Sequence, residues 1–400
     1  MNFWRQISKP IVGLSPMDGV TDASFRFITA KHGGPDVTVT EFVNIQSAFY
    51  SPHTLLKDFA YTEIERPVVA QIYGRTPGFF YKVAHIVGEL GFDGLDINMG
   101  CPAKKVAATG CGAALIRTPD LARDIIHAAK RGLEDWCNGQ HLEALDFPRP
   151  FVEQIQTIQR RRRDCGAIFE NRPIPVSVKT RLGYDRVVIE EWLQTLLAER
   201  PAAVSLHGRT LQQGYKGEAD WDAIGRAVEI AKGSGTLVLG NGDLQDLRDA
   251  DRRVRQTQVD GVLIGRGAQG DPWLFRGKQA LKDALRRGTS FIPQVESIEL
   301  AEKFRVVIEH CEHFETLNGR ARFAAMRKHL TWYCRNFRGA AELRGQMTRA
   351  NSAADVRDCL AAFLARSGDA EALRSASPCS VEAGAAGVSY SPRFSETSCA

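Results

Sequence analysis

The chain has 400 residues, of which 44% are hydrophobic and 25% are charged, and its net charge is +5. These fractions are ordinary for a globular protein, and no apolar run approaches the roughly 18 residues that a membrane span needs, so we expect no contact with a membrane. Nine cysteines without CxxC pairs predict reduced thiols in the cytoplasm, and they argue against a disulfide framework or a zinc site.

Eight apolar runs recur along the chain, and each gives way to a helical pattern. They are residues 11–14, 37–40, 68–72, 94–97, 174–179, 203–206, 236–239 and 261–264. Several are near-continuous Val, Ile and Leu runs, which are typical of strands buried on both faces of a parallel sheet. Helical patterns such as 119–131, 188–200 and 221–232 fill the gaps. This alternation predicts an α/β fold, a (β/α)8 TIM barrel over residues 1–290.

One connection, residues 132–172, is longer than a βα unit requires, and we interpret it as an insertion. It contains a helical pattern at 151–158, followed by consecutive arginines at 160–163. Such a run could contact an anion. Charge runs on inserted helices are more often solvated faces, which is the interpretation we favour.

The barrel pattern is followed by helical stripes at 295–315 and 323–337, and by a third helical pattern at 352–364 with Ser352 as its N-cap. We therefore expect a small all-helical domain over residues 291–366. From residue 367 onward the chain turns to Ser, Ala, Gly and Pro with little periodicity. This composition predicts a disordered tail over residues 367–400.

Basic residues concentrate in the helical segment. Between residues 317 and 350 they face a single acid, Glu342, and this concentration of positive charge favours a polyanionic partner. The basic residues are Arg320, Arg322, Arg327, Lys328, Arg335, Arg338, Arg344 and Arg349.

The segment 91–119 carries a thiol at a strand end. Residues 92–97 alternate apolar and acidic side chains, which predicts a strand that ends in a loop at Asn98-Met99-Gly100-Cys101-Pro102. Gly100 lets the backbone pass close to another group, and Pro102 fixes φ just after Cys101, so the thiol is held in place. A held thiol suits a reacting group, whereas most free cysteines are small buried hydrophobic residues. The segment alone leaves both interpretations open.

Two glycine-containing loops follow the last two strands, GNGD at 240–243 and GRG at 265–267. Phosphate commonly binds after strands 7 and 8 of such barrels. Backbone N–H groups opened by glycine, together with the guanidinium of Arg266, would converge on such a phosphate. Residues 265–270 also match GxGxxG, but that fingerprint belongs to an early βαβ unit, so we disfavour a dinucleotide site.

Polar side chains end three other strands, at Gln71, Lys179 and His207. A cation or an unpaired imidazole at the mouth of a barrel is unfavourable without a partner. A bound anionic ring system would satisfy both groups, and ion pairs across the rim are the alternative. The amide of Gln71 can donate and accept hydrogen bonds toward a heteroaromatic edge.

Together these segments resemble the tRNA-dihydrouridine synthases, flavoenzymes that reduce a uridine in tRNA. The resemblance covers residues 8–365. It rests on PMDGVTD at 16–22, QIYG at 71–74, DINMGCP at 96–102, VKTR at 178–181, HGRT at 207–210, NGD at 241–243 and GR at 265–266. The insertion and the tail lie outside these motifs. They leave open where the substrate binds, but they do not affect the class of reaction that the resemblance implies.

The resemblance implies an FMN cofactor reduced by NADPH or NADH, a tRNA partner, and a general acid at Cys101. It implies that FMN is held by Pro16, Met17, Asp18, Gln71, Lys179, His207, Asn241, Gly242, Asp243, Gly265 and Arg266. We expect the substrate to be bound by Asn98, Arg181, Arg327 and Lys328. We also expect a cytoplasmic monomer without a metal ion.

The chemistry agrees with these roles. Hydride addition to C6 of uracil leaves carbanion character at C5, and a thiol with an ordinary pKa of about 8.5 is mostly protonated near neutrality, so it can supply the proton. The uridine must leave its stack to reach a barrel mouth, and a basic domain can hold the RNA backbone.

Two alternatives remain at this stage. The first is an FMN barrel oxidoreductase that acts on a free pyrimidine or another small molecule, which would not need the basic helices. The second is a catalytically silent RNA-binding protein, since fold alone does not imply activity. Such a protein would not need Cys101, Lys179 and His207.

Overall fold

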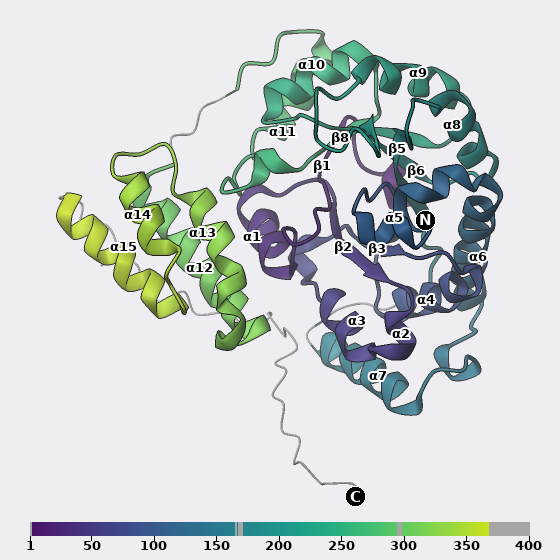
Figure 1. Cartoon of the computed structure of the whole chain (residues 1–400), viewed down its shortest axis with the longest axis horizontal. Helices are drawn as coiled ribbons and strands as arrows, with labels where there is room; N and C mark the ends of the chain where they lie inside the picture. The colour runs from purple at the N-terminus through teal and green to yellow at the C-terminus, as the bar shows by residue number, and fades with distance from the viewer. Residues whose placement is uncertain (1, 165, 167–170, 294–297, 368–400) are drawn as a thin grey trace, which may run out of the picture. The chain divides into compact units, whose positions relative to one another are not determined.

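The computed structural model describes residues 2–164, 166, 171–293 and 298–367. The chain divides into two compact units, Met1–Ser297 and Ile298–Ala400. In the first unit helices surround a set of strands, and the second consists of helices (Figure 1). No helix in the described ranges is long and apolar enough to cross a membrane. Of the predicted tail, Ser367 ends α15 and residues 368–400 lie outside the described residues.

The first unit is a (β/α)8 barrel, as predicted. Its parallel strands pair in the order β1-β8-β7-β6-β5-β4-β3-β2. The circle closes between β1 and the residues just before β2, where the N–H of Leu14 donates to Val37 O at 3.0 Å and the N–H of Asp36 donates to Val12 O at 2.9 Å. The strands are β1 Ile11–Leu14, β2 Thr38–Asn44, β3 Val68–Tyr73, β4 Gly94–Met99, β5 Val176–Gly183, β6 Ala203–Thr210, β7 Leu237–Asn241 and β8 Gly261–Ile264.

Helices cover the outer face of the barrel because the strands are apolar outward as well as inward. They are α1 Ala23–Gly33, α2 Ser47–Tyr50, α3 Pro52–Asp58, α4 Pro77–Glu89, α5 Lys104–Ala108, α6 Pro119–Cys137, α7 Arg149–Asp164, α8 Ile189–Ala198, α9 Trp221–Ala231, α10 Leu247–Thr257 and α11 Lys278–Arg287. One continuous apolar core lies between these helices and the strands.

The inside of the barrel has two different halves. Near the amino ends of the strands a second apolar cluster fills it, with Phe3 and Trp4 packed beneath Ile11, Val39 and Val69. Near the carboxyl ends the buried interior side chains are polar and come from several strands. They include Gln71, Asp96, Ser177, Ser205 and Asn241. The apolar half stabilises the fold, and the polar half forms the floor of the mouth.

The strands extend further than the sequence pattern indicated. The bounds of β1 and β8 match the prediction, but β5 continues to Gly183 and β6 to Thr210. The predicted strands stopped at the first charged side chains. In the barrel these side chains belong to the strand itself, because its interior is polar at that depth.

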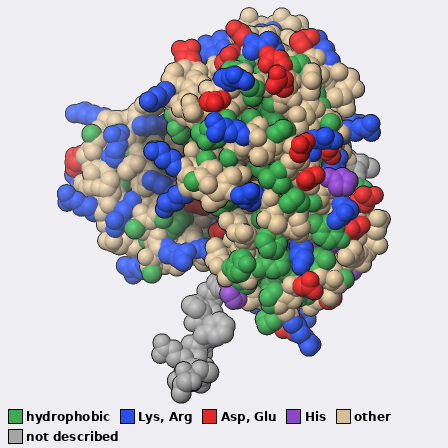
Figure 2. Space-filling model, turned by 45° about the vertical axis from the view of Figure 1, so that its right-hand side comes forward, with side chains coloured by type: hydrophobic (Ala, Val, Ile, Leu, Met, Phe, Trp, Pro, Cys, Tyr) green, Lys and Arg blue, Asp and Glu red, His purple; other side chains and the backbone are tan. Residues whose placement is uncertain are grey.

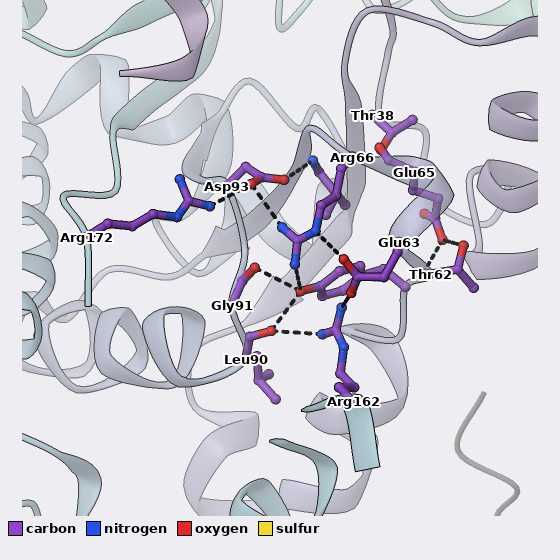
Figure 3. A network of polar contacts seen from close by, with 12 residues as sticks. Thr38, Thr62, Glu63, Glu65, Arg66, Leu90, Gly91, Asp93, Arg162 and Arg172 are labelled. Carbon is purple, nitrogen blue, oxygen red and sulfur yellow. Dashed lines mark hydrogen bonds and ion pairs between the residues drawn. The ribbon is translucent and has the colours of Figure 1, made fainter. Parts of the chain in front are cut away.

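The predicted insertion contains α7, and its arginine run is not simply a solvated face. Arg162 is 13% exposed, stacks over the ring of Tyr61 at 3.8 Å, and donates to Leu90 O at 2.9 Å. It also forms an ion pair with Glu63 (Figure 3). The interpretation of the run as solvated is therefore wrong for Arg162, because a pattern of charges does not reveal a tertiary partner.

This network lies at the amino ends of β3 and β4. Arg66, just before β3, and Arg172 both donate to Asp93, at 2.9 and 2.6 Å, and Asp93 accepts from the N–H of Val68 at 2.8 Å (Figure 3). Helix α7 is thereby attached at the opposite end of β4 from Cys101.

The second unit contains α12 Leu300–Asn318, α13 Arg327–Tyr333, α14 Ala340–Met347 and α15 Ala353–Ser367, with a 3-10 helix at Arg320–Met326. The predicted stripes meet in its core, where Phe304, Phe323, Met326 and Leu330 are buried together. Ser352 caps α15 as predicted, since its hydroxyl oxygen accepts the N–H of Asp355 at 3.1 Å. Lys and Arg side chains are frequent on the visible surface of this unit (Figure 2).

Candidate active site

The candidate site is the polar mouth at the carboxyl ends of the strands. A chain of hydrogen bonds crosses its floor from β5 to β3 and β4. Ser177 donates to Asp96 Oδ1 at 2.6 Å, and the amide of Gln71 donates to Asp96 Oδ2 at 2.7 Å. The Oε1 atom of Gln71 in turn accepts from Nδ2 of Asn98 at 3.0 Å. These contacts fix the orientation of both amides.

Asn98 uses its remaining acceptor to hold the thiol loop. Its Oδ1 accepts the N–H of Gly100 at 3.1 Å and the N–H of Cys101 at 2.8 Å. The turn after β4 is therefore a local side-chain-to-backbone motif, and it places Cys101 over the floor of the mouth. Cys101 is 8% exposed.

The surroundings of Cys101 favour the protonated form of its thiol. Burial is the main cause that raises its pKa, and the nearby carboxylate of Asp18 raises it further, although the backbone at Ala103 and the cations of Arg181 and Lys179 oppose this. A thiol with a raised pKa is a proton donor at neutral pH and a poor nucleophile.

Arg181 holds the loop that carries Cys101 through hydrogen bonds to backbone carbonyl groups. Its guanidinium is nearly buried, its Nε donates to Gly100 O at 2.7 Å, and its Nη1 donates to Thr210 O at 3.0 Å. Burial lowers the pKa of Arg181 to about 10, which leaves it charged at neutral pH. The structure thus uses much of this side chain within the protein, and its contact with substrate stays a prediction.

Lys179 and His207 lie on neighbouring strands of the mouth. The Nζ of Lys179 donates to Asn241 Oδ1 at 3.2 Å, and Asn241 donates to Leu263 O at 2.8 Å. Burial and the charge of Arg181 lower the pKa of Lys179 to about 8. Burial is also the main reason that the pKa of His207 falls to about 2, and four cations lower it further. They are Lys179, Arg181, Arg209 and Arg266.

The two predicted phosphate loops meet through Asp243. Its Oδ1 accepts from Arg266 at 3.0 Å, while its Oδ2 accepts from Arg209 at 2.6 Å and from the N–H of Ala219 at 2.8 Å. The side chain of Asp243 therefore orients two guanidinium groups, of which Arg209 is buried and Arg266 is half exposed.

Gly242 is closely packed within the first of these loops. Its φ is +131°, and a Cβ there would lie 2.7 Å from Ala219 Cβ and 3.2 Å from His207 Cδ2. The position therefore requires glycine. In the adjacent loop after β8, Gly265 faces Met17, whose Sδ would lie 3.1 Å from an added Cβ. The β1 loop, with Pro16 and exposed Asp18, is thus brought to the end of β8.

Comparison with known proteins decides the family. A sequence model described as Dihydrouridine synthase (Dus) matches residues 13–136 and 164–367. The chain belongs to the dihydrouridine synthase family. The match omits residues 137–163, which include most of α7.

Curated members of the family are similar over most of their length. The chain is 32% identical over 367 residues to "Probable tRNA-dihydrouridine synthase 2" of Bacillus subtilis (strain 168). The aligned region covers 90% of this chain and 96% of that protein. It is 31% identical over 380 residues to "Probable tRNA-dihydrouridine synthase" of Staphylococcus aureus (strain COL), with coverage of 91% and 96%. A solved structure of DHODH from Eimeria tenella in complex with ferulenol has 13% identity, a TM-score of 0.45, and coverage of 70% and 83%.

Two acidic residues at the mouth of the barrel, Asp96 and Glu41, were not predicted as site residues from the sequence. Asp96 joins Gln71 to Ser177, and burial raises its pKa to about 6. The signal was present, because an acid inside a strand that is buried throughout needs a partner. Glu41 was missed because the predicted second strand stopped at residue 40. It accepts the backbone N–H of Gly19, and burial together with Asp22 and Asp18 raises its pKa to about 7.

The two remaining predicted site residues lie in the helical unit. Arg327 donates to Ala350 O at 2.9 Å and to Asn351 Oδ1 at 2.6 Å, so it joins α13 to the segment before α15. Lys328 is half-buried. Binding of substrate by either residue stays a prediction, and Arg327 has a structural role of its own.

Proposed function

We propose that this protein reduces the C5=C6 bond of specific uridines in tRNA to 5,6-dihydrouridine, with FMN as cofactor and NADPH or NADH as reductant. We further propose that it acts as a cytoplasmic monomer. The single observation that carries the reaction is the protonated, buried thiol of Cys101, held by Asn98 beside Lys179 and Arg181. Family membership and the names of the curated relatives support uridine in tRNA as the substrate.

The residues of the mouth fit FMN. Four cations, Lys179, Arg181, Arg209 and Arg266, face neutral His207, and the compensating carboxylates are Asp243 and Asp96. The excess of positive charge suits a phosphate and an anionic ring. Backbone N–H groups of the Gly242 and Gly265 loops, together with the guanidinium of Arg266, are the donors that would contact such a phosphate. Arg266 would hold the phosphate directly, and Asp243 would act mainly by orienting Arg266.

The chemistry that FMN would supply at this site, when bound and reduced, is a hydride for C6 of the uracil ring. The Sγ–H of Cys101 gives its proton to C5, which completes the addition of two hydrogens. Asn98 and Gln71 hold the loop so that the thiol reaches the ring from a fixed position. Lys179, charged below a pKa of about 8, stabilises the negative charge of the reduced ring system.

A reconstituted assay tests this proposal. The protein is loaded with FMN and mixed with NADPH and an unmodified tRNA transcript, and dihydrouridine is quantified in the RNA. We expect turnover with tRNA and no comparable turnover with free uridine or orotate. Preferred reduction of a free pyrimidine would indicate a small-molecule oxidoreductase. A colourless protein that takes up no FMN would indicate an RNA-binding module.

A further inference from the structure

The loop that follows β6 carries the exposed aromatic side chain Tyr215, with 68% of its surface accessible. The backbone on either side of it is unusually well fixed. Arg181 donates to Gly214 O at 3.4 Å, and Arg209 donates to Lys216 O at 3.4 Å and to Gly217 O at 2.6 Å. Both arginines are nearly buried, so two charged groups beneath the loop are committed to its carbonyl groups.

Local geometry reinforces this anchoring. Gly214 and Gly217 adopt left-handed φ values of 59° and 61°, which turn the chain before and after Tyr215 at little steric cost. The amide of Gln213 donates to Lys216 O and to Glu218 O, both at 3.0 Å. The ring of Tyr215 is therefore presented to solvent from a rigid turn, and binding to it costs little loop entropy.

The same loop is connected to the thiol. Arg181, which holds Gly214, also donates through Nε to Gly100 O at 2.7 Å, one residue before Cys101. The guanidinium of Arg266 lies 5.4 Å from the centre of the Tyr215 ring. Tyr215 therefore lies at the mouth, next to the proposed phosphate loop. Its loop is joined through Arg181 to the loop that carries Cys101.

A second aromatic ring lies on the neighbouring loop. Tyr184 follows β5, and the guanidinium of Arg117 stacks on its ring at 3.5 Å. The two loops are joined, because the N–H of Gln212 donates to Tyr184 O at 2.9 Å. Two aromatic rings, each with an arginine beside it, therefore stand on joined loops at one side of the mouth.

We propose that Tyr215, with Tyr184 beside it, is a stacking platform for unpaired RNA bases that flank the uridine entering the mouth. This inference rests on the proposed function, because it names the surface that receives the rest of the RNA loop. An extruded uridine leaves neighbouring bases unstacked, and aromatic side chains with nearby arginines are the groups that bind such bases without strict sequence preference.

The test compares Tyr215→Ala, Tyr215→Leu and Tyr215→Phe in the full-length protein. Affinity for an unmodified tRNA transcript is measured without reductant. We expect Ala and Leu to weaken binding by roughly 5- to 100-fold, as loss of one base–aromatic stack does, and Phe to bind like the wild type. The thermal midpoint should not change, because the ring is exposed. Ile64→Ala, an exposed apolar residue before β3, is the control and should bind normally.

An abasic nucleotide placed in turn at each unpaired position of the same RNA loop separates stacking from a general effect. Where the missing base is the one that stacks on Tyr215, the abasic RNA should bind the wild type more weakly than the intact RNA does. Tyr215→Ala should bind the abasic RNA and the intact RNA equally well. Wild-type affinity in Tyr215→Ala, or an equal loss in Tyr215→Phe, would overturn the platform, and so would fully additive losses at every position. Because no turnover is needed, a protein that binds tRNA but forms no dihydrouridine would refute the proposed function and not the platform.

Discussion

Cys101 has the two properties that a proton donor needs, a fixed position and a retained proton. The fixed position comes from Asn98, and the retained proton comes from burial, which raises the thiol pKa. His207 is a poorer candidate for the proton donor. Its pKa of about 2 means that the imidazole is neutral at physiological pH and does not carry the second proton of an imidazolium. The division of roles among these side chains follows from their environments.

Replacement of Cys101 by alanine tests the role of the thiol. Cys101→Ala should bind FMN and be reduced by NADPH like the wild type, because neither step uses the thiol. The rate of dihydrouridine formation should decrease by about 10²–10⁴-fold, as expected for the loss of a positioned acid. Stopped-flow measurements of flavin reduction and of reoxidation by tRNA separate the two steps. Wild-type reoxidation by tRNA in the variant would contradict the assignment.

Glu41 gives a prediction about pH. Its folded pKa of about 7 exceeds the unfolded value of 4.5, so the folded state binds more protons between these values and the free energy of unfolding falls as pH rises through this window. Glu41→Gln cannot ionise and still offers an acceptor to Gly19. We expect it to be more stable than the wild type by about 1–3 kcal/mol at pH 8, with most of this gain lost at pH 5.

Chemical denaturation at the two pH values measures this difference. Glu153→Gln, an exposed glutamate on α7, is the matched control and should show no such change with pH. A gain for Glu41→Gln that is equal at pH 5 and pH 8 would mean that the carboxyl group does not titrate in this window.

At the level of elements, the strands and the long helices α6, α8 and α9 were predictable because each strand is an apolar run and these helices have a regular apolar face. The ends of β5 and β6 were not, since Arg181 and His207 resemble loop residues until the polar floor of the barrel is known. The thiol loop was predictable from Gly100, Cys101 and Pro102. The buried arginines that hold it and the Tyr215 loop were not, because carbonyl partners leave no sequence signal.

Helix α7 offers a test of an element that the family match omits. Arg162→Ala removes a stack on Tyr61 and bonds to Glu63 and Leu90, and it should lower the free energy of unfolding by about 1–3 kcal/mol. Arg161→Ala, an exposed neighbour, should change it by less than about 0.5 kcal/mol. Equal stabilities of the two variants, measured by denaturant unfolding, would show that α7 is not held through Arg162.

For the whole molecule, we propose that the helical unit supplies positive charge for the binding of tRNA. Several cations there have structural roles, since Arg327 binds Ala350 O and Arg344 donates to Cys334 O at 2.6 Å. Arg322, Arg338 and Arg349 are exposed, so they are better candidates for contact with phosphates. Arg344 is exposed as well, so its bond to Cys334 O, and not burial, gives it a structural role.

Replacement of these three arginines by alanine should weaken tRNA binding while leaving the flavin spectrum unchanged. Each lost phosphate contact should reduce the slope of log K against log salt by about 0.7–0.9. Binding titrations over a range of salt concentrations measure this slope, with Arg160→Ala on α7 as the control. If the triple variant retains the wild-type affinity and slope, the RNA is bound by other surfaces of the protein.

The most direct test of the central claim is a map of dihydrouridine in the tRNA of cells that lack this protein. One or more specific dihydrouridines should revert to uridine, each lighter by the mass of two hydrogen atoms. The wild-type protein should restore them, and Cys101→Ala should not. An unchanged dihydrouridine map in the deletion strain would contradict the proposed function, and full restoration by Cys101→Ala would contradict the role of the thiol.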